Sequence, residues 1–245
     1  MPFIGGVEIL IVIGAVLGGF VSGLTGFGTG ITALPVWLYA VSPALAAPLV
    51  VVCSLAAQLQ TIHRIRHAID WRRILPFIAG GALGVPIGTA ILPLVEVEPF
   101  RRFVGLLLIT YCVALIATRT GTMRLAAGRF ADGCVGLAGG VLGGLAGLSG
   151  IPPILWSRFR SWDKDAQRSL FQVFNLTILA LSGVSMAVAG FVTGDLVLLA
   201  LVALPGTILG AFIGRRLYDR LETDRFNTIV LALLGIAGLT LVLNP

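Results

Sequence analysis

The chain has 245 residues, of which 57% are hydrophobic and only 11% are charged, and its mean hydropathy is +1.01. Soluble domains carry about 25% charged residues, so this composition excludes an ordinary soluble protein and indicates a polytopic membrane protein. The net charge of +6 comes from short basic clusters between apolar runs. Such clusters are typical of topology signals and exclude a nucleic-acid-binding face.

The first predicted element is a helical hairpin over about 7–40 that is broken by glycine and proline. Its core sequence, GGFVSGLTGFGTGITALPVW at 18–37, is apolar enough for the membrane but repeatedly interrupted by glycine and by Pro35. A span needs about 20 apolar residues, and 7–40 is too long for one span and too rich in helix breakers for two. We therefore expect two helical arms that enter and leave the membrane from one face.

Three continuous spans follow, then a second broken hairpin and three more spans. The second hairpin, over about 130–157, contains GGVLGGLAGLSGIPPILW at 139–156. The predicted spans are 43–63, 74–93, 100–118, 167–190, 195–214 and 226–243.

Basic residues in the short loops predict the orientation of these elements, because cytoplasmic loops are enriched in arginine and lysine. The loops at 64–73, 119–129, 158–168 and 215–225 are basic, whereas the turn around Asp195 and both ends of the chain are not. We expect the basic loops in the cytoplasm and both termini in the periplasm. The two hairpins then enter from opposite faces, and Arg101 with Arg102 is the exception to the rule.

An internal repeat connects the two halves. At an offset of 121, four glycines of the first hairpin coincide with glycines of the second, and at an offset of 126 three glycines of a later span do the same. We therefore predict an all-α membrane protein of two inverted-topology repeats, 1–120 and 121–245, each with one glycine-broken hairpin and three transmembrane helices. This is a common plan of secondary transporters, in which one unit moves against the other around a central site.

The breaks predict an anion site. An arm that begins after each break, near Thr29 and near Gly150, presents free N–H groups and the positive end of its dipole. The candidate residues at the breaks are Gly23, Thr25, Gly26, Gly28, Thr29, Gly30, Gly144, Gly147, Ser149 and Gly150. The alternative is that glycines only allow close helix packing, which we favour for Gly80, Gly84 and Gly88.

Polar residues inside the following spans extend this candidate site. They are Ser54, Gln58, Gln172 and Asn175, which either line the pathway or form hydrogen bonds between helices. The eleven acidic residues all lie at span ends or in loops, so no carboxylate relay for protons is visible. Catalytic motifs and metal-ligand clusters are also absent, which predicts a protein that is not an enzyme and has no cofactor.

The paired segments GLTGFGTG at 23–30 and GLAGLSGIPP at 144–153 resemble the TauE/SafE family of sulfite exporter-like permeases. The resemblance implies an eight-segment inner-membrane protein that exports sulfite or an organosulfonate such as sulfoacetate. Thr29 and Ser149 interrupt the glycine runs that family members carry, and they add hydroxyl groups there. We expect a secondary transporter with alternating access, with an anion channel or a permease for another small anion as the alternative. The expected partners are a small anion and the bilayer, without nucleic acid, and a homo-oligomer stays open.

Overall fold

The computed structural model describes residues 4–60, 70–118, 128–160, 162, 164–218 and 223–244. Every regular element in these ranges is helical. The predicted cytoplasmic residues Arg64, Arg66, Arg119, Arg124 and Arg220 lie outside the described residues. The elements are α1 (Ile4–Thr25), α2 (Thr29–Trp37), α3 (Pro43–Leu59), α4 (Trp71–Ile91), the 3-10 turn η3 (Leu92–Leu94), α5 (Val97–Ala117), α6 (Arg129–Ala146), α7 (Ile151–Arg158), α8 (Lys164–Val188), α9 (Gly194–Tyr218) and α10 (Thr223–Leu243).

Five helices in the described residues are long and apolar enough to cross a membrane: α1, α4, α5, α8 and α9. Helix α3 has 17 residues and is a shorter apolar helix, as is the described end of α10 at Leu234–Leu243. The all-helical prediction is therefore confirmed. The two glycine-rich segments differ from the others because each holds one long helix and one short helix, α1 with α2 and α6 with α7.

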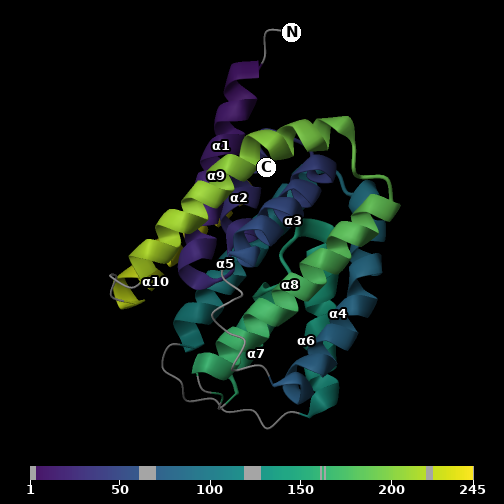
Figure 1. Cartoon of the computed structure of the whole chain (residues 1–245), viewed down its shortest axis with the longest axis vertical. Helices are drawn as coiled ribbons and strands as arrows, with labels where there is room; N and C mark the ends of the chain where they lie inside the picture. Colours follow the sequence, from purple (N-terminus) through teal and green to yellow (C-terminus); the bar gives the residue numbers. More distant parts are fainter. Residues whose placement is uncertain are drawn as a thin grey trace.

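Two pairs of helices pack with their backbones in contact, α1 against α9 and α4 against α6 (Figure 1). Glycine makes this approach possible, since a Cβ at Gly84 or Gly88 would overlap the carbonyl oxygen of Leu137 or Val141 on α6. Gly80 meets Gly133 in the same way. The prediction that Gly80, Gly84 and Gly88 serve helix packing is therefore confirmed, as expected for small residues between membrane helices.

The short helices α2 and α7 are held in the interior by tryptophan. The indole Nε1–H of Trp37, which is fully buried at the end of α2, donates to the carbonyl oxygen of Ile11 on α1 at 3.0 Å. The indole of Trp156 on α7 likewise donates to the Asp132 carboxylate on α6 at 2.8 Å. Each indole ties a short arm back to its long arm, so the turn between the arms is fixed deep in the bundle.

Candidate functional site

The first break lies between α1 and α2, where Gly26 has φ +82° and Gly28 has φ +115°. Side chains disfavour these left-handed conformations, so glycine is required at both turns. The Thr25 hydroxyl donates to the carbonyl oxygen of Val21 at 2.9 Å and accepts from the Phe27 N–H at 3.2 Å. Thr25 therefore stabilises the turn itself.

The second break lies between α6 and α7 and has the same type of helix end. Gly147 has φ +69°, and its N–H donates to the Gly143 carbonyl oxygen at 2.9 Å, while the Leu148 N–H donates to that of Leu142 at 3.1 Å. These bonds satisfy the last carbonyls of α6, as glycine-based helix ends commonly do.

The two breaks meet in the interior of the bundle. A Cβ on Gly30 would lie 2.9 Å from the Gly147 carbonyl oxygen, so the start of α2 touches the end of α6. Between them is a cavity with about 20 Å³ of space open to water, which is room for about one water molecule. Its lining contains no charged side chain and consists of Phe27, Gly28, Gly30, Ile31, Ser54, Tyr111, Gly147, Leu148, Gly150, Ile151, Ile154 and Asn175.

The hydrogen-bond donors at this cavity come mainly from the first break. The first N–H groups of a helix have no acceptor within it, and in α2 these belong to Thr29, Gly30 and Ile31. Helix α7 has proline at its second and third positions, Pro152 and Pro153, and proline has no N–H. The two helix starts are therefore unequal as anion sites.

The second break contributes a side-chain pair in place of backbone donors. The buried Ser149 hydroxyl donates to the Oδ1 atom of Asn175 on α8. Asn175 lines the cavity and lies beside Gly150, where a Cβ would be 3.5 Å from its Oδ1. Because this oxygen accepts from Ser149, the Asn175 amide presents its N–H₂ group as the remaining donor.

Gln172, one turn before Asn175 on α8, has an amide with no described hydrogen-bond partner. Its side chain is 3% exposed, and both Nε2 and Oε1 are buried without a partner in the described part of the chain. A Cβ at Gly26 would overlap the Nε2 atom, so the amide lies directly against the first break. The rings of Phe27 and Phe171 pack edge to face at 6.0 Å beside it. Leaving a buried amide unpaired costs about 1–3 kcal/mol, which is a reason to expect a ligand there.

The structure brings together most of the predicted site residues, but not all of them. Gly28, Gly30, Gly147, Gly150, Ser54 and Asn175 line the cavity. Ser149 bonds to Asn175, and Gln172 lies against Gly26, which precedes Phe27 in the lining. Gly23 faces α9 and Gly144 faces α4, because a Cβ there would overlap the carbonyl oxygen of Ala211 or Val85. Like Gly80, Gly84 and Gly88, these two glycines allow close packing against the backbone of a neighbouring helix.

Three further predicted residues lie outside the cavity lining. Thr25 bonds within the first break, and Gln58 is buried on α3 one turn after Ser54. The Thr29 methyl group is close to Gly18 on α1, and its buried hydroxyl has no partner among the described residues. The Thr29 side chain therefore faces α1 rather than the cavity.

Sequence reasoning missed Tyr111, which lines the cavity from α5. Its side chain is 3% exposed, although α5 belongs to neither hairpin. The signal was present in the sequence, because a tyrosine in the middle of an apolar span must place its hydroxyl near a polar partner or a cavity.

The comparisons with known proteins add the family. A family model described as "Sulfite exporter TauE/SafE" matches residues 10–241, nearly the whole chain. No curated protein and no solved structure matches the chain with significant similarity.

Within the described residues, no three His, Cys, Asp or Glu side chains gather where a metal ion could bind.

Proposed function

Because the chain belongs to the TauE/SafE family of sulfite exporters, we propose that it exports sulfite or an organosulfonate such as sulfoacetate by alternating access. The family is a transporter family rather than an enzyme family, and the apolar helices make this chain a multi-pass membrane protein. The inner membrane, the periplasmic termini and the two inverted repeats, 1–120 and 121–245, are parts of the same proposal.

The observation that carries the proposal is the meeting of both breaks around an uncharged cavity. An oxyanion there would accept hydrogen bonds from the N–H groups at the start of α2. The Gln172 amide, which lies against Gly26 at the same break, is a further buried donor that would reach an anion once the arms separate. Helix starts and amides bind oxyanions through aligned dipoles without a full positive charge. The Asn175 amide and the Tyr111 hydroxyl would complete the site from the other side.

The helix packing supports the inverted repeats. Each proposed repeat has five α-helices, α1 to α5 and α6 to α10. The first helix of each repeat packs on the fourth helix of the other, α1 on α9 and α6 on α4. The third helices, α3 and α8, pack on each other, and so do the fifth, α5 and α10. An exchange of the two halves leaves this pattern of neighbours unchanged. Two units that share a central site in this way can rock against each other, which is how inverted-repeat transporters expose a site to each face in turn.

The size of the cavity favours a carrier over the alternative, an anion channel. With about 20 Å³ of space, the cavity has room for about one water molecule. A sulfonate with an organic tail needs the arms to separate before it enters. A channel would need a continuous wide path instead.

Flux measurements in liposomes test the proposal directly. We expect the purified chain to carry sulfite with saturation, and to exchange external for internal sulfite in counterflow. The same assay with sulfoacetate decides between the two substrate classes. Flux that rises with voltage without saturation or counterflow would establish the channel, and no flux of either anion under any gradient would overturn the proposed function.

The variant Gln172→Met tests the role of the amide. Methionine keeps the length of the side chain but removes both unpartnered polar atoms, so we expect the free energy of unfolding to rise by about 1–3 kcal/mol. We expect transport to fall at least tenfold, measured as kcat/KM for sulfite. The matched control is Thr207→Val, which removes a buried hydroxyl that bonds to Ala203 of its own helix and to the Cys53 thiol of α3. Neither partner lines the central cavity, so transport should be unchanged. A destabilised Gln172→Met protein with normal transport would contradict the assignment.

A further inference from the structure

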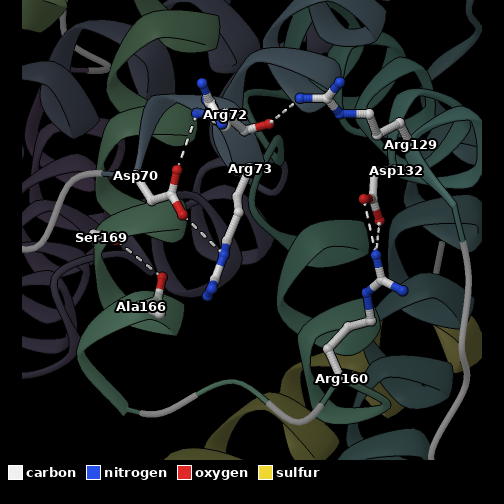
Figure 2. Close-up of polar contacts among 8 residues, drawn as sticks. All are labelled: Asp70, Arg72, Arg73, Arg129, Asp132, Arg160, Ala166 and Ser169. Atoms are coloured by element: carbon white, nitrogen blue, oxygen red, sulfur yellow. Dashed lines mark hydrogen bonds and ion pairs between the residues drawn. The ribbon is translucent and has the colours of Figure 1, made fainter.

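A second, larger polar pocket lies where α4 and α6 begin. It has about 420 Å³ of open space and is lined by Asp70, Arg72, Arg73, Gly128, Arg129, Asp132, Arg160 and Trp162. Figure 2 shows Asp70 and Arg73 on one side of an open space and Asp132 and Arg160 on the other. The central cavity shares none of these residues.

The walls of the pocket are fixed by ion pairs and aromatic contacts. Arg73 pairs with Asp70 at 2.9 Å, and Arg160 donates to both carboxylate oxygens of Asp132, at 2.9 and 3.0 Å. The ring of Trp162 contacts both arginines, with its centroid 6.0 Å from the Arg73 guanidinium and 5.4 Å from that of Arg160. The Asp132–Arg160 wall is largely buried and fixed, whereas the Asp70–Arg73 pair is about half exposed and lies at the mouth of the pocket.

Positive charge remains in the pocket after these pairs are counted. Its lining carries four arginines and two aspartates, and both aspartates are engaged by Arg73 and Arg160. Arg72 and Arg129 form no ion pair with a described carboxylate. Within the described part of the chain, Arg129 donates to the Arg72 carbonyl oxygen, at 3.4 Å (Figure 2).

The positions of these arginines add to the unbalanced charge. Arg72 lies in the first turn of α4, and Arg129 is the first residue of α6. The start of a helix carries a partial positive charge, which disfavours cations there and attracts anions. The N-cap of α6 is Gly128, which has no side chain to accept a hydrogen bond. The first N–H groups of α6 therefore lack a side-chain acceptor at their N-cap.

We propose that this pocket binds an oxyanion, a phosphate, sulfite or sulfonate group, between the Arg72 and Arg129 guanidiniums and the start of α6. Such a group would neutralise the charge of Arg72 and Arg129, because Asp70 and Asp132, which lie at the starts of α4 and α6, are already paired with Arg73 and Arg160. Arginine is suited to it because its planar donors match the oxygens of these groups in pairs. The group comes either from a soluble anion or from the phosphate of an anionic lipid, since basic pockets between membrane helices bind such headgroups. The inference does not depend on transport through the central cavity.

Binding measurements on the purified full chain in neutral detergent test the soluble source. The probes are radiolabelled inorganic phosphate and sulfite, and the variants are Arg72→Gln, Arg129→Gln and both together. We expect each single variant to weaken binding about fivefold and the double variant more, with a strong dependence on salt. The matched control is Arg102→Gln, which removes the same charge from an exposed position on α5.

Native mass spectrometry from mixed vesicles of phosphatidylglycerol and phosphatidylcholine tests the lipid source. Retention of phosphatidylglycerol by the wild type and its loss in the double variant, but not in Arg102→Gln, would assign the pocket to a lipid. If neither probe binds, or if all three single variants change binding equally, the proposal is overturned. Gln172→Met separates the two sites, because it should affect the central cavity and leave phosphate binding at the arginine pocket unchanged.

Discussion

The two breaks begin with the same left-handed glycine but differ in their chemistry. Gly26 and Gly147 correspond at the repeat offset of 121, and both end a long helix with a positive φ. Each also faces the central helix of the other half of the chain. Gly26 lies against the Gln172 amide of α8, whereas Gly147 lies against Val50 and Val51 of α3.

The unequal neighbours indicate how recognition would be divided between the halves. Gln172 corresponds at the same offset to Val51, so only one of two matching positions carries an amide. The first break adds free N–H groups, while the second replaces two of them with Pro152 and Pro153. Both halves thus contain a break that shapes the cavity, but most of the hydrogen-bond donors belong to the first break. The bound anion would then lie nearer to the first break.

The largest effect is expected at the two glycines that precede the breaks. A Cβ at Gly23 or Gly144 would overlap a backbone carbonyl oxygen of α9 or α4, and a backbone cannot move aside as a side chain can. Gly23→Ala and Gly144→Ala should each lower the free energy of unfolding by more than about 3 kcal/mol, measured by thermal unfolding in detergent. Gly235→Ala is the control, since nothing lies within 4 Å of its Cβ position. Folded variants that fail only in transport would instead place these glycines in the anion site.

The next effect compares the two breaks directly through Gly147→Ala and Gly26→Ala. Both changes force alanine into a left-handed conformation, at about 1–2 kcal/mol. At Gly147 the new methyl group meets the stiff, buried Val50, whereas at Gly26 it meets the end of the flexible Gln172 side chain. We expect Gly147→Ala to be the less stable protein and Gly26→Ala to lose more transport relative to its loss of stability.

Gly190→Ala measures the backbone strain alone, because Gly190 has φ +84° and open space around it. Subtraction of its effect from those of the two break variants leaves the contribution of the neighbours. If the corrected losses of stability and of transport are equal for Gly26→Ala and Gly147→Ala, the proposal that most anion donors lie at the first break is contradicted.

The smallest effect is expected for Ser149→Ala, which has no hydroxyl counterpart in the first break because Gly28 is at the matching position. Loss of the hydrogen bond to Asn175 should lower stability by about 1 kcal/mol and change KM for sulfite more than kcat. The control is Ser182→Ala, whose hydroxyl bonds to Ile178 of its own helix. An equal effect of both variants on KM would show that the Ser149–Asn175 pair has no special role.

The positions of the two breaks could be predicted from the sequence, but which side of each glycine-rich helix faces the cavity could not. Glycines grouped with proline in an apolar run indicate a break at membrane depth, and the cavity forms at Gly28, Gly30 and Gly147. Gly23 belongs to the same sequence motif, yet it lies three residues before Gly26 on a continuous helix and faces α9. Which side of a glycine-rich helix meets its neighbour depends on tertiary packing.

Contacts between distant segments were the other limit. Tyr111 reaches the cavity from a helix more than 30 residues before the second break, and no local pattern connects the two. The unequal donor sets, in contrast, could have been read from Pro152 and Pro153, since proline lacks an N–H in every context. The all-helical architecture followed from composition and apolar run length because the bilayer admits few other structures.

The absence of charged side chains from the cavity lining has an electrical consequence for the proposed transporter. Neutral N–H groups and amides can hold an anion, but they move no compensating charge with it. Each transport cycle would therefore carry net negative charge across the bilayer. A membrane potential of about 100 mV, negative inside, would favour the exit of each elementary charge by about 2.3 kcal/mol, so the resting potential alone could drive export.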